Sequence, residues 1–300
     1  MKKIYLNILI YTSIVFLFIY LYKFDYFAFD EVEFVLWPLV VSTILLWGGY
    51  LLSTLSWYNI LNRYDFTVTV KQAIISHGLA IFAKYIPGKI WVILGRAGYF
   101  SKYGYSLKTT SFLSLKEQLI YVWEGLVIST VPMLFIYGFT LFALMVLFIT
   151  LFLTFLLFSE KFHNRLLIIF TKITKKELDL PFMKFNDSYS IMLYVFVYWV
   201  VWLFAFGFFV FSFYRDADFR VSFAFPLSVT LGLLAIIFPG GIGVREGIMS
   251  GYLVISGIPL DIAIVISVYA RLWFVSGEIF IFLVALIMSK RIRKKSKSGG

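Results

Sequence analysis

The sequence predicts an all-helical protein that crosses a membrane several times. Of its 300 residues, 61% are hydrophobic and 14% are charged, whereas soluble domains are about half apolar and about a quarter charged. The chain also carries 35 Phe, 20 Tyr and 8 Trp, which is more aromatic surface than a soluble globule of this size can bury. A water-soluble fold is therefore excluded, and we expect a polytopic membrane protein.

Six stretches have the length and low charge needed to cross a hydrocarbon core of about 30 Å, which takes about 20 apolar residues. They lie at 4–22, 34–58, 117–137, 139–158, 189–213 and 261–288. The first follows Lys2 and Lys3, but it is too long for a signal peptide and no small-residue cleavage site comes after it. We therefore expect it to remain as a membrane anchor.

The distribution of Lys and Arg predicts that both termini are cytoplasmic. With the N-terminus inside, 19 of the 27 basic residues fall in cytoplasmic segments, including six in 161–184 and six in the basic tail 289–300. Only Lys23, Arg215 and Arg220 fall outside, as the positive-inside rule requires. Topology therefore explains the net charge of +11, and we expect no nucleic-acid partner.

Two further apolar stretches, 73–100 and 223–256, do not have the form of ordinary spans. Each has a short apolar arm before a Pro-Gly pair, at 87–88 and at 239–240, and a second short arm after it. Pro breaks a helix, Gly permits a tight turn, and arms of about 11 to 16 residues are too short to cross a bilayer comfortably. We predict two re-entrant helical hairpins, although the charge count is equally compatible with a pair of tilted full spans in each stretch.

This assignment divides a single membrane domain, residues 1–300, into two halves of opposite orientation. Residues 1–137 hold two spans, a hairpin on the cytoplasmic side and a closing span; residues 139–288 hold the same order with the hairpin on the outer side. Such an inverted repeat is typical of alternating-access transporters, whose site lies at mid-membrane where broken helices meet. The sequence thus predicts six transmembrane helices and two re-entrant hairpins in an inverted repeat.

The membrane-embedded segments contain more basic than acidic residues. The basic residues are Lys84, Lys89, Arg96, Arg245 and Arg271. The acidic residues are Glu117, Glu124, Glu246 and Glu278. Because a charged side chain at the bilayer centre costs about 2.5 to 3.5 kcal/mol, these groups must be paired, hydrated or close to an interface. The small positive surplus favours an anionic substrate.

The two closing spans carry charges at matching spacing. Glu117 and Glu124 are seven residues apart, as are Arg271 and Glu278, so each pair shares one helical face. We predict that Glu124, Glu246 and Glu278 act as counter-charges or proton carriers.

Two charged residues have structural interpretations. Lys84 is expected to reach the membrane interface, and Glu117, beside Lys116, is expected at the start of its span.

The turn 239–247, with the sequence PGGIGVREG, has the components of an anion-binding site. Its glycines, Gly240, Gly241 and Gly243, let backbone N–H groups approach a ligand, and the half-helix after them presents the positive end of its dipole. Arg245 can add a bidentate contact to phosphate or carboxylate, although Arg245 beside Glu246 also fits an ion pair that only fixes the hairpin. The candidate head-group ligands are Lys89, Arg96, Arg245 and Arg271, together with these three glycines.

Metal and thiol chemistry are not expected. The chain has no Cys and two His, His77 and His163, so disulfides and Cys nucleophiles are excluded, and two His cannot build a metal site unaided. Asp216 and Asp218 have the spacing of a sugar-nucleotide metal site but lie in a predicted outer loop. We therefore assign no catalytic residue, no metal and no cofactor.

At the two Pro-Gly turns the sequence resembles the lysylphosphatidylglycerol synthase transmembrane region, also called the flippase-like domain family. The resemblance rests on 87–89 with 95–96, and more specifically on the nine residues 239–247. The full-length synthases carry a soluble aminoacyl transferase domain after this region, whereas no soluble segment follows residue 288 here, so a stand-alone member is expected. The resemblance implies movement of membrane lipids or lipid-linked glycans across a bacterial or archaeal cytoplasmic membrane.

Three hypotheses about function remain open. The first is a transporter, not an enzyme, that moves an anionic lipid or a polyprenyl-phosphate-linked glycan with its head group held at the two Pro-Gly turns. The second is a membrane enzyme acting on polyprenyl phosphates, although such phosphatases resemble a Pro-Gly-x-Ser-Arg-Ser turn with a Glu-x-x-x-Glu helix, which this sequence lacks. The third is a proton-coupled small-solute transporter that uses Glu124 or Glu278.

The segment 159–176 is amphipathic and basic. We expect it to lie on anionic lipid of the inner leaflet. The sequence leaves open whether the chain forms a homo-oligomer.

Overall fold

The computed structural model describes residues 34–86, 90–175, 182, 184–235, 238–241 and 243–298, and every regular element in this part of the chain is a helix. The long helices are α2 (Leu36–Arg63), α5 (Leu107–Tyr137), α6 (Leu141–Phe158), α8 (Phe185–Phe213) and α11 (Leu260–Ser298). Each of these five contains a stretch long and apolar enough to cross a membrane. The predicted all-α membrane fold is confirmed; the predicted first span, 4–22, lies outside the described residues.

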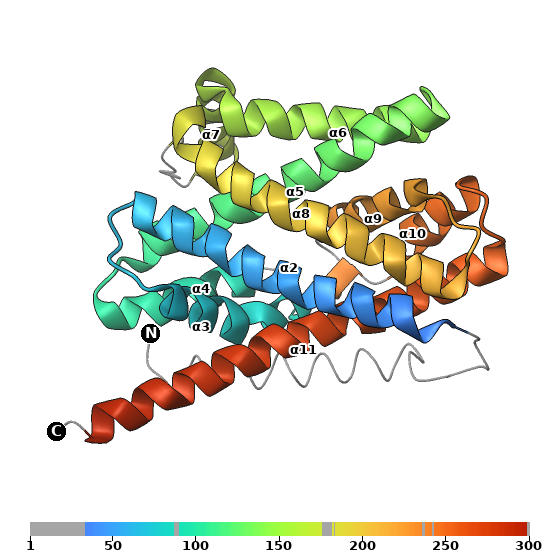
Figure 1. Ribbon diagram of the computed structural model, residues 1–300. Coiled ribbons are helices and arrows are strands. Elements are labelled where there is room, and N and C mark those ends of the chain that lie inside the picture. The colour runs from blue at the N-terminus through green and yellow to red at the C-terminus, as the bar shows by residue number, and fades with distance from the viewer. Residues whose placement is uncertain are drawn as a thin grey trace.

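Four of the five long helices, all but α6, extend past the bounds that hydropathy predicts. α5 begins at Leu107 instead of 117, because the Ser106 hydroxyl caps its N-terminus by accepting a hydrogen bond from the Thr109 amide at 3.4 Å. α11 continues to Ser298, so most of the predicted basic tail extends this helix beyond the rest of the molecule (Figure 1). Hydropathy locates the apolar part of a helix, whereas its caps set the ends.

The other helices are short. They are α3 (Val70–Ala80), η1 (Ile81–Tyr85), α4 (Trp91–Phe100), η2 (Ser101–Tyr103), α7 (Glu160–Thr174), η3 (Phe219–Phe223), α9 (Ala224–Leu234), η4 (Pro239–Gly241) and α10 (Val244–Ile255). α3 pairs with α4, and α9 pairs with α10. The longest helix of these pairs has 12 residues, or about 18 Å at 1.5 Å per residue, which is less than the roughly 30 Å of a hydrocarbon core.

In the α3–α4 pair, the chain enters and leaves at the same end of the molecule. The ring of Phe66, just before α3, stacks on the ring of Tyr105, just after α4, with centroids 4.3 Å apart and planes inclined by 15°. α3 begins with a capping box, in which Thr69 and Gln72 each accept a hydrogen bond from the other's amide. The described parts of α3 and α4 therefore form a pair that begins and ends at the same end of the molecule.

The α9–α10 pair also returns on itself. η3, which leads into α9, packs on α5 and α8. The hydroxyl of Ser256, just after α10, lies 2.6 Å from the hydroxyl of Tyr137, the last residue of α5. Figure 1 shows α9 and α10 at the end of the molecule opposite to α3 and α4.

The two halves of the described chain pack in corresponding ways. α2, from the first half, and α8, from the second, run side by side (Figure 1). The Trp202 indole of α8 donates a hydrogen bond to the Leu46 carbonyl of α2 at 3.1 Å. α3 packs on α11 as α9 packs on α5, and α4 packs on α5 as α10 packs on α11. Exchanging the two halves therefore reproduces the packing pattern.

Candidate functional site

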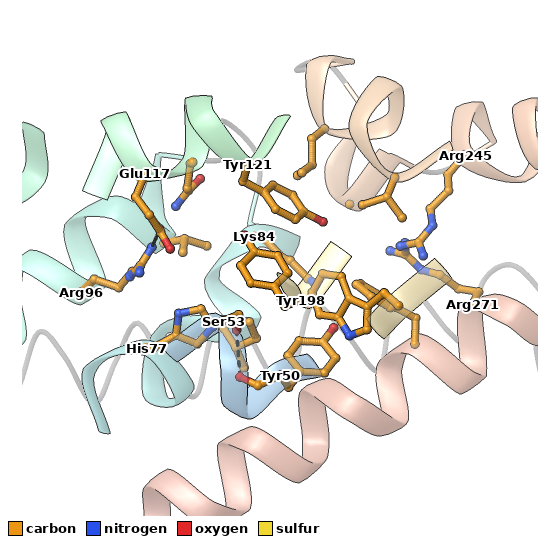
Figure 2. A pocket seen from close by; sticks show the side chains of 18 residues that line it. Tyr50, Ser53, His77, Lys84, Arg96, Glu117, Tyr121, Tyr198, Arg245 and Arg271 are labelled. Carbon is orange, nitrogen blue, oxygen red and sulfur yellow. Dashed lines mark hydrogen bonds and ion pairs between the residues drawn. The ribbon is translucent and has the colours of Figure 1, made fainter. Parts of the chain in front are cut away.

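A partly open cavity of about 140 Å³ lies where the two helix pairs meet. η1, from the first pair, contacts η4, from the second. The cavity is lined by basic residues from both pairs and from α11: Lys84, Arg96, Arg245 and Arg271. Figure 2 shows Arg96 and Arg245 on opposite sides of this cavity. The structure thus brings three of the four predicted head-group ligands to one cavity; the fourth, Lys89, lies outside the described residues.

At one side, Arg96 of α4 forms an ion pair with Glu117 of α5. The Arg96 Nη1 donates to the Glu117 Oε2 at 2.8 Å, and both side chains are buried. The guanidinium also lies over the ring of Trp57, 4.0 Å from its centroid, where a cation is attracted to the π face. This side of the cavity is formally neutral, although the Arg96 Nε and Nη2 have no hydrogen-bond partner among the described residues.

Between the two sides, Lys84 of η1 is paired with Glu278 of α11. The Tyr85 hydroxyl donates to the other oxygen of the same carboxylate at 2.8 Å. Glu278 is fully buried, so these contacts offset part of the cost of removing its charge from water. Glu278 therefore acts as a counter-charge to Lys84 at the edge of the cavity.

At the other side, Arg245 of α10 and Arg271 of α11 lie together (Figure 2). Arg245 is 5% exposed and its guanidinium lies 4.3 Å from the Phe274 ring centroid. Its Nη2 has no hydrogen-bond partner among the described residues. Glu117 is the one acidic residue in the described lining of the cavity, and it is already paired with Arg96. This side of the cavity therefore holds two guanidinium groups.

The glycine-rich turn differs from the predicted anion cradle. Gly240, Gly241 and Gly243 all have left-handed φ angles, of 63°, 77° and 73°, but only Gly240 lines the cavity. The Gly241 amide donates to the Phe238 carbonyl at 3.0 Å, and the Gly243 amide donates to the Glu246 Oε2 at 2.8 Å. These two N–H groups are therefore used inside the turn, and Gly241 and Gly243 shape the turn instead of binding a ligand directly.

Gly240 brings the turn close to Arg271. A Cβ atom at Gly240 would lie 2.7 Å from the Arg271 Nη2 and 3.1 Å from the Tyr85 ring. The absence of a side chain therefore lets η4 approach η1 and α11 at the cavity wall.

Two of the predicted counter-charges lie elsewhere. Glu246 caps the N-terminus of its own helix, α10, and is absent from the cavity lining. Glu124 lines a separate apolar groove of about 310 Å³ with Phe185 and Tyr189. Its Oε2 is buried without a hydrogen-bond partner among the described residues. Glu124 and Glu278 hold corresponding positions in the two closing spans, but Glu124 lines an apolar groove whereas Glu278 forms an ion pair with Lys84.

Sequence reasoning assigned two residues of the cavity to other roles. Glu117 lies well inside α5, not at a helix start, because α5 begins at Leu107. Lys84 lies in a 3₁₀ turn and pairs with Glu278, so its ammonium is directed into the protein instead of toward an interface. The available signal was that each residue is charged within an otherwise apolar segment.

The pair Asp216 and Asp218 lies in an exposed loop. Asp218 accepts hydrogen bonds from the Arg220 amide and from its Nε, both at 2.9 Å. The amide, with the guanidinium, holds the pKa of Asp218 below its usual range. Asp218 therefore caps η3 and pairs locally with Arg220.

Comparison of the chain with protein-family models, with curated proteins and with solved structures finds no match. The fold and the cavity define the class: an all-α membrane protein with a cavity, lined by basic residues, between two pairs of short helices.

Proposed function

We propose that this protein is a flippase-like transporter that moves an anionic lipid across the membrane, with the head group held in the cavity between the two helix pairs. The observation that carries the proposal is the position of Arg245 and Arg271 together on the cavity wall, with the Arg245 Nη2 buried and without a hydrogen-bond partner among the described residues. Two guanidinium groups that face one space repel each other, and an anion between them removes the repulsion and adds charge-assisted hydrogen bonds. Phosphate is the anion that this geometry suits best.

We further infer that α3–α4 and α9–α10 are re-entrant hairpins that enter from opposite faces of the membrane. Two observations support this inference. The helices of each pair are too short to cross the bilayer, and each pair returns to the end of the molecule at which it started. The positive-inside rule then places α3–α4, both termini and α7 on the cytoplasmic side. The resemblance at 87–89, 95–96 and 239–247 agrees with this frame and favours a bacterial or archaeal cytoplasmic membrane.

The arrangement suggests a route for the head group. The outer hairpin contributes Arg245 and the inner hairpin contributes Arg96, on opposite sides of one cavity. A phosphate that leaves Arg245 can therefore bind a second guanidinium, that of Arg96, by displacing Glu117 from its ion pair. In this mechanism the acyl or prenyl tails stay in the bilayer while the head group crosses through the protein.

The test is lipid movement by the purified protein in liposomes. We expect the wild type to accelerate the crossing of labelled anionic lipids, measured by chemical reduction of the label in the outer leaflet. Arg245→Gln removes a charged hydrogen-bond donor worth about 1.5 to 3 kcal/mol, so we expect the rate to fall by about tenfold or more. Arg215→Gln, in an exposed loop, is the matched control and should leave the rate unchanged.

The same preparation separates the alternatives. A rate equal to that of empty liposomes for every anionic lipid would overturn the proposal. Phosphate release from a polyprenyl pyrophosphate would favour the membrane enzyme, and saturable uptake of a water-soluble solute coupled to protons would favour the solute transporter.

We also propose that α7 lies on the anionic inner leaflet. Lys161 and Arg165 are exposed, as are Ile168 and Ile169, which is the composition of an interfacial helix. Binding to anionic vesicles that weakens as salt is raised would support this contact.

A further inference from the structure

His77 lies in the last turn of α3 and lines the cavity. Both of its ring nitrogens are buried, and neither has a hydrogen-bond partner among the described residues. A neutral imidazole has one N–H donor and one acceptor nitrogen, whereas the protonated ring has two donors. Because buried polar groups are normally hydrogen-bonded, this ring is available to a ligand in the cavity.

His77 lies on the same side of the cavity as Arg96 and away from Arg245 (Figure 2). The Arg96 Nε and Nη2 are also buried without a hydrogen-bond partner in the part of the chain that the structure describes. Along the proposed route, the phosphate occupies this side as well as the Arg245 side. Phosphate oxygens accept hydrogen bonds, so the guanidinium and the imidazole can both donate to the same phosphate.

The charges around His77 connect proton binding to the occupancy of the cavity. α3 packs on α2, η1, α4 and α11. The charged and titratable side chains that these helices bring to the cavity region are Tyr50, Lys84, Arg96, Arg271 and Glu278, and α5, α8 and α10 add Glu117, Tyr121, Tyr198 and Arg245. Arg96 and Lys84 are the two whose charges act on the ring. Cations repel an added proton, whereas an anion beside the ring attracts one.

The carboxylates that the sequence offers as proton carriers are less suited to this role. Glu278 is paired with Lys84, Glu246 caps α10, and Glu124 lines a separate groove. Glu117 does line the cavity, and an anion that displaces it from Arg96 frees its carboxylate to bind a proton. Glu117 is therefore the alternative that the experiment must distinguish from His77.

We propose that His77 is a proton-binding site coupled to the anion site: the ring takes up one proton from solution when a phosphate occupies the Arg96 side of the cavity, and loses it when the phosphate leaves. This inference rests on the proposed function and adds an energy source to it. A lipid that crosses together with a proton is driven toward the more alkaline side of the membrane.

The first experiment measures the binding of short-chain phosphatidylglycerol to the purified full chain between about pH 5.5 and 8.5, a range around the ordinary histidine pKa of about 6.5. This lipid is a phosphate diester and keeps one negative charge throughout, so any pH dependence belongs to the protein. We expect the affinity to rise as the pH falls, by up to about tenfold per pH unit where one proton is taken up per lipid. Calorimetry in two buffers with different heats of ionisation counts that proton.

The two histidines of the chain give a matched pair of variants. His77→Gln keeps a donor and an acceptor but does not titrate, so it should take up no proton and bind with one affinity across the range, below that of the wild type at low pH. His163→Gln, on α7 and outside the described lining of the cavity, should keep the proton uptake. If His77→Gln takes up as many protons as the wild type, Glu117 or another group binds the proton and the proposal is wrong.

A direct measurement does not require a change at His77. In His163→Gln, purified with a tag that contains no histidine, His77 is the only imidazole, and its ring signals in NMR report its protonation. At a pH where the ring is neutral without lipid, we expect added phosphatidylglycerol to convert it to the protonated form. A ring that stays neutral in the lipid complex would overturn the proposal even if His77→Gln does not fold.

Liposomes with a pH gradient test the coupling during transport. With the wild type, labelled phosphatidylglycerol should accumulate in the leaflet on the more alkaline side, whereas with His77→Gln it should only equilibrate between the leaflets. An equal distribution with the wild type would exclude proton-driven movement.

The outcomes separate this inference from the proposed function. If phosphatidylglycerol binds and crosses but no proton is taken up at any pH, the transporter stands and the role of His77 is wrong. If no anionic lipid binds at any pH, both proposals fail.

Discussion

Gly240 combines a left-handed backbone with close packing at the cavity wall. Its φ is 63°, and an added Cβ would meet the Arg271 Nη2 and the Tyr85 ring. We expect Gly240→Ala to lower the free energy of unfolding by about 1 to 2 kcal/mol from the left-handed backbone alone, and further because Arg271 must move. The affinity of the variant for the anionic lipid should fall as well. Both effects are measured on the purified protein, stability from the thermal unfolding midpoint and affinity from lipid binding.

Gly243 provides the comparison for this substitution. Its φ is 73°, but nothing lies within 4 Å of an added Cβ. Gly243→Ala should therefore show the backbone cost without displacing Arg271, so stability falls and head-group affinity stays. Equal loss of affinity in the two variants would show that Gly240 does not act through Arg271.

The Arg96–Glu117 pair gives a second prediction for single residues. Removing one partner of a buried ion pair leaves an uncompensated charge, which costs about 3 to 5 kcal/mol. We expect Glu117→Gln to destabilise the protein by an amount in this range, measured by denaturant or thermal unfolding in detergent. The double variant Arg96→Gln, Glu117→Gln should recover part of the loss, and Glu160→Gln, exposed at the start of α7, should have little effect.

At the scale of the helix, Gly78 allows α3 to lie against α11. A Cβ at Gly78 would lie 2.6 Å from the Ile281 carbonyl oxygen and 2.6 Å from the Ala285 Cβ. Ala favours helix over Gly by about 1 kcal/mol, yet we expect Gly78→Ala to lower the thermal unfolding midpoint because the two helices must separate. Gly48→Ala in α2, with nothing within 4 Å, should leave the midpoint unchanged or raise it.

The elements were predictable where local pattern determines them. Apolar length predicted five helices that the structure describes, and the Pro-Gly pairs predicted the two short-helix pairs. The ends were not predictable from hydropathy, because α5 starts at a Ser106 cap within a polar segment. Because the predicted span began at 117, Glu117 was expected at a helix start, and its pairing with Arg96 was not predicted.

Contacts between distant segments were the part of the site that the sequence could not supply. Intramembrane charge selected Arg96, Arg245 and Arg271 correctly as residues that share one region. It could not show that Lys84 pairs with Glu278, 194 residues away. The expectation that backbone N–H groups at 239–247 face the ligand does not hold for Gly241 and Gly243, because their amides bond within the turn.

Across the whole molecule, the two halves share their packing but not their charges. In the first half, Arg96 of α4 meets Glu117 of α5, whereas in the second half the corresponding helices, α10 and α11, bring Arg245 beside Arg271. A repeated frame thus holds an acid–base pair in one half and two neighbouring guanidinium groups in the other. The proposed anion site depends on this difference. The order of the spans in the sequence does not predict it, because that order does not show which side chains meet.

The membrane topology yields a prediction for the whole chain, because the sequence contains no Cys and each introduced Cys is unique. Arg63→Cys and Lys108→Cys flank the α3–α4 pair, and Asp216→Cys and Asp261→Cys flank the α9–α10 pair; all four side chains are exposed. We expect an impermeant maleimide to label the second two in intact cells and the first two only after permeabilisation.

A fifth variant separates re-entrant hairpins from full spans, which the flanking positions alone do not. Phe238 lies just before the η4 turn and is 47% exposed. In a re-entrant hairpin from the outer face, Phe238→Cys stays within the membrane and resists labelling from the cytoplasm, whereas two full spans would place it in the cytoplasm. Rapid labelling from the cytoplasmic side in inverted vesicles would exclude the re-entrant hairpin, and with it the meeting of two opposed turns at mid-membrane on which the proposed head-group route depends.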